Sequence, residues 1–154
     1  MKLAFLHDHR NGVAEWEKRD LLDWITDRFE APAIRIAPGC TTDIRQHIAD
    51  EFQVEGWGQD VRIDQSLNLT ISAMKDDLAF QLQTGNISRA PYDLLKLQHL
   101  YESGRRIEAA ALALPTRDAA ARIGSNIANA ERVIKEMTAF DRVITVPVLL
   151  IAFE

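Results

Sequence analysis

A nearly continuous apolar run between residues 107 and 114 places the strongest constraint on the fold. The run reads IEAAALAL, carries a single charge at Glu108, and is followed by Pro115-Thr116. An apolar segment of this length that stops at a proline is typical of a strand buried on both faces. Such a strand needs a covering layer on each side, so the run predicts a sheet flanked by helices.

Helical periodicity occurs on both sides of this run. Apolar residues recur at spacings of three and four, which predicts helices over 13–30, 43–54, 90–103 and 117–139. The last of these is expected to break near Gly124. Thr42 is a suitable N-cap for the second helix. Pro91 lies in the first turn of the third helix, and Gly104 follows its end.

Strand patterns fill the remaining segments. Residues 61–73 and 78–83 alternate between apolar and polar, and Lys75-Asp76-Asp77 separates them, which predicts a hairpin. Shorter β-rich segments span 33–36, 143–146 and 148–153. The helix over 90–103 lies between two strands, so a right-handed crossover should place 78–83 parallel to 107–114. The fold class is therefore α/β, with a mixed central β-sheet flanked by α-helices in one domain over residues 1–154.

Composition narrows the class of protein. The 154 residues are 47% hydrophobic and 27% charged, which excludes disorder, collagen-like repeats and a disulfide scaffold. No apolar run is long enough to cross a membrane, so no membrane partner is expected. The single cysteine, Cys40, cannot form an internal disulfide, which favours a cytoplasmic location. The formal charge of −5 argues against a nucleic-acid binder, although residues 75–135 hold 9 basic against 7 acidic side chains.

Two segments contain side chains that could form a functional site. His7-Asp8-His9 has metal-ligand side chains, but no second cluster supports it, and a solvated N-terminal segment is the favoured interpretation. Gln81 and Gln83 are two residues apart, so both face the same side of a strand. Amides on one face of an apolar strand indicate that this face is either solvated or lines a site. Phosphate-binding glycine loops, nucleophile elbows and zinc-protease motifs are absent from the sequence.

Two stretches resemble a known family. ISAMKDDLAFQLQTGNISRAPYDLLKLQHLY (71–101) and TRDAAARIGSNIANAERVIKEMTAFDRVITVPVLLIAFE (116–154) resemble type II restriction endonucleases of the BglII kind, within the PD-(D/E)xK nuclease superfamily. The resemblance covers roughly residues 50–154. It implies a restriction-endonuclease-like fold, Mg²⁺-dependent hydrolysis of DNA phosphodiesters, double-stranded DNA as partner, and a homodimer.

The resemblance also implies a set of site residues. In the family, the second hairpin strand carries Glu-x-Gln or Glu-x-Glu, and the matching pair here is Gln81 and Gln83. Gln81 stands where the metal-binding glutamate is expected, and a neutral amide is a weaker Mg²⁺ ligand. Counting back to the expected aspartate reaches Ser72. The substitute acids are Asp64 and Asp77, and Glu51 and Glu55 from the second helix are further candidates for the same site.

Polar residues after the second hairpin strand are the expected DNA contacts. They are Asn86, Ser88, Arg89, Lys96 and Asn126, with Arg105 and Arg106 at the helix end as further cations or as helix-dipole partners. Three functions remain open at this point. The first is a Mg²⁺-dependent DNA endonuclease, and the second is a catalytically inactive relative that binds DNA or a protein partner. The third is an unrelated α/β interaction domain whose resemblance to the family is a coincidence.

Overall fold

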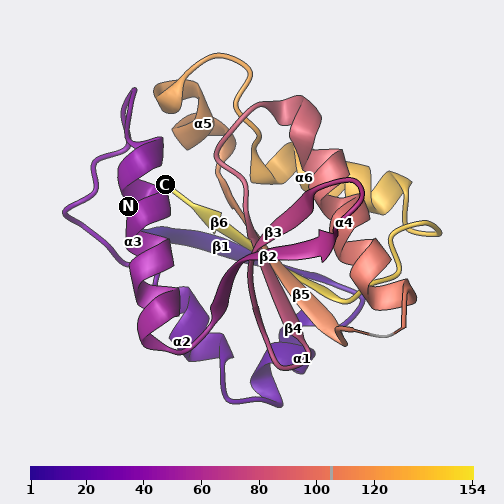
Figure 1. Cartoon of the computed structure of the whole chain (residues 1–154). Coiled ribbons are helices and arrows are strands. Elements are labelled where there is room, and N and C mark those ends of the chain that lie inside the picture. The colour runs from indigo at the N-terminus through magenta and orange to yellow at the C-terminus, as the bar shows by residue number, and fades with distance from the viewer. Residues whose placement is uncertain (105) are drawn as a thin grey trace.

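The chain forms one six-stranded mixed sheet with helices on both faces (Figure 1). The computed structural model describes residues 1–104 and 106–154. Strands occur in the order β1-β6-β5-β4-β3-β2 across the sheet. Their bounds are β1 Leu3–His9, β2 Gly58–Asp64, β3 Leu69–Lys75, β4 Leu78–Leu82, β5 Ala109–Pro115 and β6 Val148–Phe153. The helices are α1 Gly12–Glu17, α2 Leu22–Asp27, α3 Thr41–Val54, the 3-10 turn η1 Ile87–Arg89, α4 Ala90–Glu102, α5 Arg117–Ile123 and α6 Ala130–Ala139.

The predicted central strand is confirmed as β5. Every residue of β5 is buried, and the strand runs parallel to both β4 and β6. Ala109, Ala111 and Ala113 face one apolar core, while the residues between them face the other. The small alanine side chains leave room for large aromatic residues from the helices. The predicted parallel pairing of 78–83 with 107–114 is therefore also confirmed.

Two apolar cores lie on opposite faces of the sheet. Helices α1, α2, α3 and α5 contribute to the first core, and α4 and α6 contribute to the second. The predicted helix over 117–139 is two helices, because α5 and α6 cover opposite faces and the chain must pass between them. In the first core, Trp57 stacks at 5.8 Å between ring centroids against both Trp16 and Trp24.

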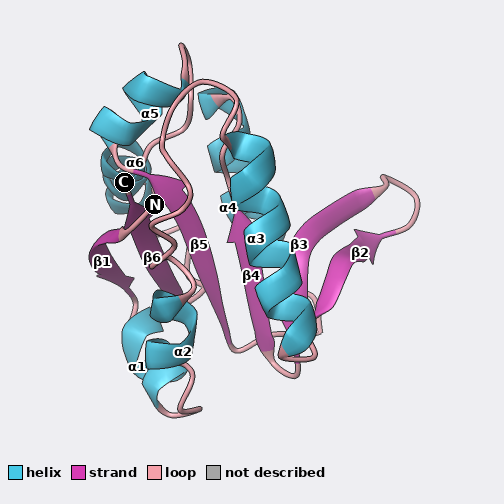
Figure 2. Ribbon diagram, turned by 90° about the vertical axis from the view of Figure 1, so that its left-hand side faces the viewer, coloured by secondary structure: helices cyan, strands magenta, loops and turns pink. Residues whose placement is uncertain are grey.

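The hairpin prediction is confirmed, but its first strand is shorter than expected. β3 and β4 pair antiparallel, with Lys75 opposite Leu78 and Asp76 at a φ of 50° in the turn. The alternating segment 61–73 is not one strand. It forms β2 and β3, which make a second hairpin at the sheet edge (Figure 2), because Asp64 and Asn68 turn the chain between them.

The N-terminal third departs most from the predictions. The expected helix over 13–30 is split into α1 and α2, because Asp20 adopts a φ of 56° and the chain turns there. Residues 33–36 form no strand, and neither do residues 143–146. The predicted N-cap Thr42 lies inside α3, whose N-cap is Cys40, a free and buried thiol.

The His7-Asp8-His9 segment belongs to a strand that the sequence analysis missed. β1 pairs antiparallel with β6, and buried His9 has its Nε2 atom 2.8 Å from the carbonyl oxygen of Ile144. Burial lowers the pKa of the neighbouring His7. The interpretation of this segment as solvated is therefore wrong at His9. None of the helices in the described chain is long and apolar enough to cross a membrane.

Candidate functional site

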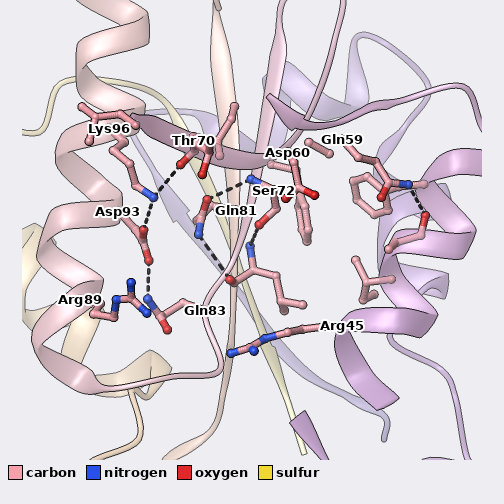
Figure 3. Close-up of a pocket in the computed structure, with 18 of the residues that line it drawn as sticks. Arg45, Gln59, Asp60, Thr70, Ser72, Gln81, Gln83, Arg89, Asp93 and Lys96 are labelled. Carbon is pink, nitrogen blue, oxygen red and sulfur yellow. Dashed lines mark hydrogen bonds and ion pairs between the residues drawn. The ribbon is translucent and has the colours of Figure 1, made fainter. Parts of the chain in front are cut away.

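A polar pocket of about 630 Å³ lies between α3, the β2–β3–β4 edge of the sheet and the start of α4 (Figure 3). Its described lining includes three cations, two carboxylates and five side-chain amides. The cations are Arg45, Arg89 and Lys96; the carboxylates are Asp60 and Asp93; the amides are Gln46, Gln59, Asn68, Gln81 and Gln83. On a chain with a formal charge of −5, this pocket is locally positive.

Gln81 and Gln83 both line the pocket, as expected from their spacing on a strand. Each is buried and each is held by hydrogen bonds. The Oε1 atom of Gln81 accepts from the Ser72 backbone N–H at 3.1 Å. The Oε1 atom of Gln83 accepts from Gly85 N–H at 2.7 Å, and its amide nitrogen donates to Asp93. The amide face thus lines a pocket and is not open to bulk solvent.

Asp60, Ser72 and Gln81 form a row across three neighbouring strands. Gln59 pairs with Ala73 and Val61 with Ile71, which places Asp60 opposite Ser72. Ala73 pairs with Phe80, so the same register continued by one residue places Ser72 opposite Gln81. The Ser72 hydroxyl oxygen accepts from the Leu82 backbone N–H at 3.0 Å. Within this row, Asp60 is the only ionised side chain.

Asp93 and Lys96 form an ion pair against the wall of the pocket. Their charged atoms are 2.7 Å apart, and the two side chains are 4% and 12% exposed. The Lys96 ammonium also donates to the Thr70 carbonyl oxygen at 2.9 Å, which ties α4 to β3. Because both groups are buried, the charge of Lys96 is largely compensated by Asp93.

Arg45 and Arg89 take part in none of the ion pairs between described residues. Arg45, on α3, donates from Nε to the hydroxyl of Thr84 at 3.1 Å. Arg89 ends η1 and is the N-cap residue of α4. Figure 3 shows both side chains at the same end of the pocket, on either side of Gln83. These two guanidinium groups are the uncompensated positive charges among the described residues of the site.

The sequence-predicted acids lie away from this pocket. Asp64 is the last residue of β2, where it accepts from Ser66 Oγ at 2.7 Å, and this hydrogen bond lowers its pKa. Glu51 pairs with Arg28 at 2.6 Å. Asp77 precedes β4 whereas Gln83 follows it, so strand length separates the two by roughly 20 Å. Glu55 pairs with Lys75 at 3.4 Å. None of these four carboxylates lines the pocket.

Asp77 instead forms a two-pronged ion pair with Arg19, which supports a pH-dependent prediction. Hydrogen bonds from Arg19 lower the pKa of Asp77. The pair therefore stabilises the fold above the unfolded pKa of about 3.9, and this stabilisation is lost as pH falls through the lowered folded pKa. Asp77 is 41% exposed, so solvent screening limits the effect to about 1 kcal/mol.

The test compares Asp77→Asn with wild type by urea denaturation. At pH 7 the variant is expected to lose about 1 kcal/mol of unfolding free energy, and at a pH below the unfolded pKa of about 3.9 the difference should be smaller. An equal deficit at both pH values would contradict the assignment.

The predicted DNA-contact residues fall into two groups. Arg89 and Lys96 line the pocket, whereas Asn86, Ser88 and Asn126 do not. The Asn86 side chain accepts from the Ser88 N–H at 2.9 Å, and the Asn126 carbonyl accepts from the Ile87 N–H at 2.8 Å. These contacts hold the loop that carries Arg89. Arg106 donates to the Ile63 carbonyl at 3.3 Å, and Arg105 lies outside the described residues.

Sequence reasoning missed Arg45, Asp60 and Asp93. The alternation over 61–73 predicts one strand, and this prediction leaves Asp60 outside the strand and Ser72 without a partner strand that would bring Asp60 opposite it. The i,i+3 spacing of Asp93 and Lys96 was visible, but it is common on helix surfaces. Arg45 lies on the polar side of α3, and its position beside Gly85 depends on tertiary packing alone.

The donor set does not fit a Mg²⁺ centre at the position that the resemblance implied. Mg²⁺ prefers carboxylate oxygens in octahedral geometry. Ser72 and Gln81 are neutral, and Asp93 is engaged by Lys96 and Gln83. Across residues 1–104 and 106–154, no group of three acidic, histidine or cysteine side chains is placed to hold a metal ion. Among the described residues that line the pocket, Asp60 is thus the one unengaged carboxylate.

Comparison with known proteins places this pocket in context. The family model described as restriction endonuclease BglII/BglIII matches residues 5–153. The crystal structure of restriction endonuclease BglII complexed with a DNA 16-mer aligns with a TM-score of 0.73 and 14% identity, covering 100% of this chain and 78% of that chain. The structure of free BglII aligns with a TM-score of 0.73 and 16% identity, covering 100% and 80%.

A search of curated protein sequences found no match. The solved structures share the mixed sheet with flanking helices, so the predicted restriction-endonuclease-like fold is confirmed. The family match extends over nearly the whole chain, well beyond the segment 50–154 that carries the resemblance in sequence. This chain belongs to the restriction endonuclease BglII/BglIII family.

Proposed function

We propose that this protein binds double-stranded DNA, with the pocket between α3 and α4 facing the sugar-phosphate backbone. One observation carries the proposal: on a chain with a net negative charge, this pocket gathers guanidinium groups and amides. Phosphate oxygens are recognised by such groups, and phosphate contacts supply most of the affinity for DNA. The DNA bound to the structurally similar BglII supports the choice of partner.

Binding is tested by fluorescence anisotropy with a labelled DNA duplex of mixed sequence. We expect saturable binding whose affinity falls steeply with added salt, because binding releases counterions. An unchanged anisotropy at low salt would reject the proposal. Sedimentation velocity of the free protein tests the homodimer, which stays a prediction.

Hydrolysis of DNA with Mg²⁺ is the second candidate function. This function is favoured because Asp60, Asp93 and Lys96 line one pocket. Metal-dependent hydrolysis of phosphodiesters uses carboxylates and an ammonium group. The neutral Ser72 and Gln81 weigh against it. Incubation of plasmid DNA with Mg²⁺ or Mn²⁺ decides between the two functions, with Asp60→Asn as the control that abolishes any cleavage from this pocket.

A single substitution is expected to create metal affinity in this pocket. Gln81→Glu adds a second unengaged carboxylate to the row that contains Asp60, and ligand charge is a main determinant of affinity for hard cations. We expect calorimetry to show at least about tenfold tighter Mn²⁺ binding than in wild type. Gln81→Ala removes the amide without adding charge and should bind no better than wild type. Equal Mn²⁺ affinity in all three proteins would contradict the prediction.

A further inference from the structure

The uncompensated positive charge of the pocket lies at one end. Lys96 is paired with Asp93, and Asp60 stands on β2, in the row of Gln81 and two strands away from β4. Arg45 and Arg89 flank Gln83 at that end (Figure 3). A ligand that enters there meets two guanidinium groups and no unengaged carboxylate among the described residues of that end.

Arg45 is oriented by the residues that follow β4. Its Nε atom donates to Thr84, which is 2% exposed, so the two Nη groups remain available to a ligand. The Arg45 guanidinium also lies beside Gly85. A Cβ atom built there would lie 3.9 Å from Nη2 of Arg45, an ordinary van der Waals contact, and 3.1 Å from Oε1 of Gln83, a tight one. The glycine thus leaves room for the Gln83 amide, which lies between the two arginines.

Arg89 is held by its loop rather than by a side-chain contact. Gly85 carbonyl accepts from Ala128 N–H at 2.9 Å, and Ile87 N–H donates to the Asn126 carbonyl at 2.8 Å. Asn86 caps η1. These bonds fix the backbone of the loop that carries Arg89 at the start of α4. The positive end of the α4 dipole adds to the local potential at the same point.

We propose that Arg45 and Arg89 together hold one phosphodiester of the DNA backbone without a divalent cation. A guanidinium fork matches two phosphate oxygens, and two forks on one phosphate supply the positive charge that a metal would otherwise provide. The proposal rests on the proposed DNA binding and adds to it the residues, the ligand group and the independence from metal.

The experiment measures binding of a labelled duplex in EDTA by wild type, Arg45→Gln, Arg89→Gln and the double variant. Arg132→Gln is the matched control, because it removes the same charge from α6, outside the pocket lining. Each pocket variant is expected to bind the duplex about tenfold more weakly, because it loses one charged hydrogen-bonded contact. The control should bind like wild type. Arg45→Lys keeps the charge but loses the fork, so it should be weaker than wild type as well.

The salt dependence of DNA affinity shows whether Arg45 and Arg89 hold one phosphate together or two separate phosphates. The slope of log affinity against log salt is about −0.9 per neutralised phosphate. The double variant should therefore reduce the magnitude of the slope by about 0.9, whereas two separate phosphates would give about 1.8. Circular dichroism of each variant verifies that the fold is intact.

Three results would overturn the inference while leaving DNA binding in place. They are binding that appears only with added Mg²⁺ or Mn²⁺, pocket variants that bind like Arg132→Gln, and a slope change near 1.8 in the double variant. A wild-type protein that binds no DNA, with or without metal, would overturn the proposed function together with this inference.

Discussion

Replacing Gly12 with alanine is expected to lower the free energy of unfolding by about 3 kcal/mol, the upper part of the range for overpacking a rigid contact. An added Cβ atom would lie 2.1 Å from the carbonyl carbon of Val148 and 2.4 Å from its oxygen. Both are backbone atoms of β6, a strand paired on both sides, so they cannot move aside. The start of α1 would have to lift off the sheet.

Gly39→Ala is the matched control for this substitution. Gly39 has a φ of +90° but no atom within 4 Å of an added Cβ, so only the backbone penalty of about 1 kcal/mol applies. Chemical denaturation of both variants measures the difference. A Gly12→Ala protein as stable as Gly39→Ala would show that α1 does not need this close approach.

Asp93→Ala is the second substitution with a large expected effect. It removes the partner of Lys96 and of the Gln83 amide, and breaking a buried ion pair costs about 3 kcal/mol of unfolding free energy. The same variant releases the Lys96 charge into the pocket, so its affinity for DNA is expected to rise although its stability falls. Denaturation and anisotropy on one preparation measure the two effects.

Two further variants test whether the Asp93 effect comes from the ion pair. Asp93→Asn keeps an acceptor oxygen and should lose less stability than Asp93→Ala. The double variant Asp93→Ala/Lys96→Met removes both charges and should recover part of the loss, because no buried charge is left unpaired. A double variant that is less stable by the sum of both single effects would contradict the coupling.

Local sequence patterns were sufficient to predict the elements whose residues are uniformly buried or regularly alternate. The apolar segment that became β5 could be predicted because both of its faces are covered, so its sequence carries no competing signal. The β3–β4 hairpin could be predicted from alternation and a short polar turn. α4 was anticipated with its proline in the first turn.

Elements that depend on distant partners could not be predicted in the same way. β1 is an edge strand with polar residues, and it exists because β6, more than 130 residues later, offers it hydrogen bonds. The separation of α1 from α2 results from a turn at Asp20 that lets Trp16 enter the core at 0% exposure. In both cases the local sequence is compatible with another structure, and tertiary contacts select the observed one.

The sequence by itself determined the family resemblance, the mixed sheet with helices on both faces, and the common direction of Gln81 and Gln83, because periodicity and spacing are local properties of a strand. Only the tertiary structure decided which charges accompany those amides. Asp64 and Asp77 are close to the amides in sequence, but Asp64 ends β2 and Asp77 precedes β4, and neither lines the pocket. Arg45 and Asp60 reach the pocket from α3 and β2. Side chains meet according to strand register and helix packing, and both are set by the burial of the whole core.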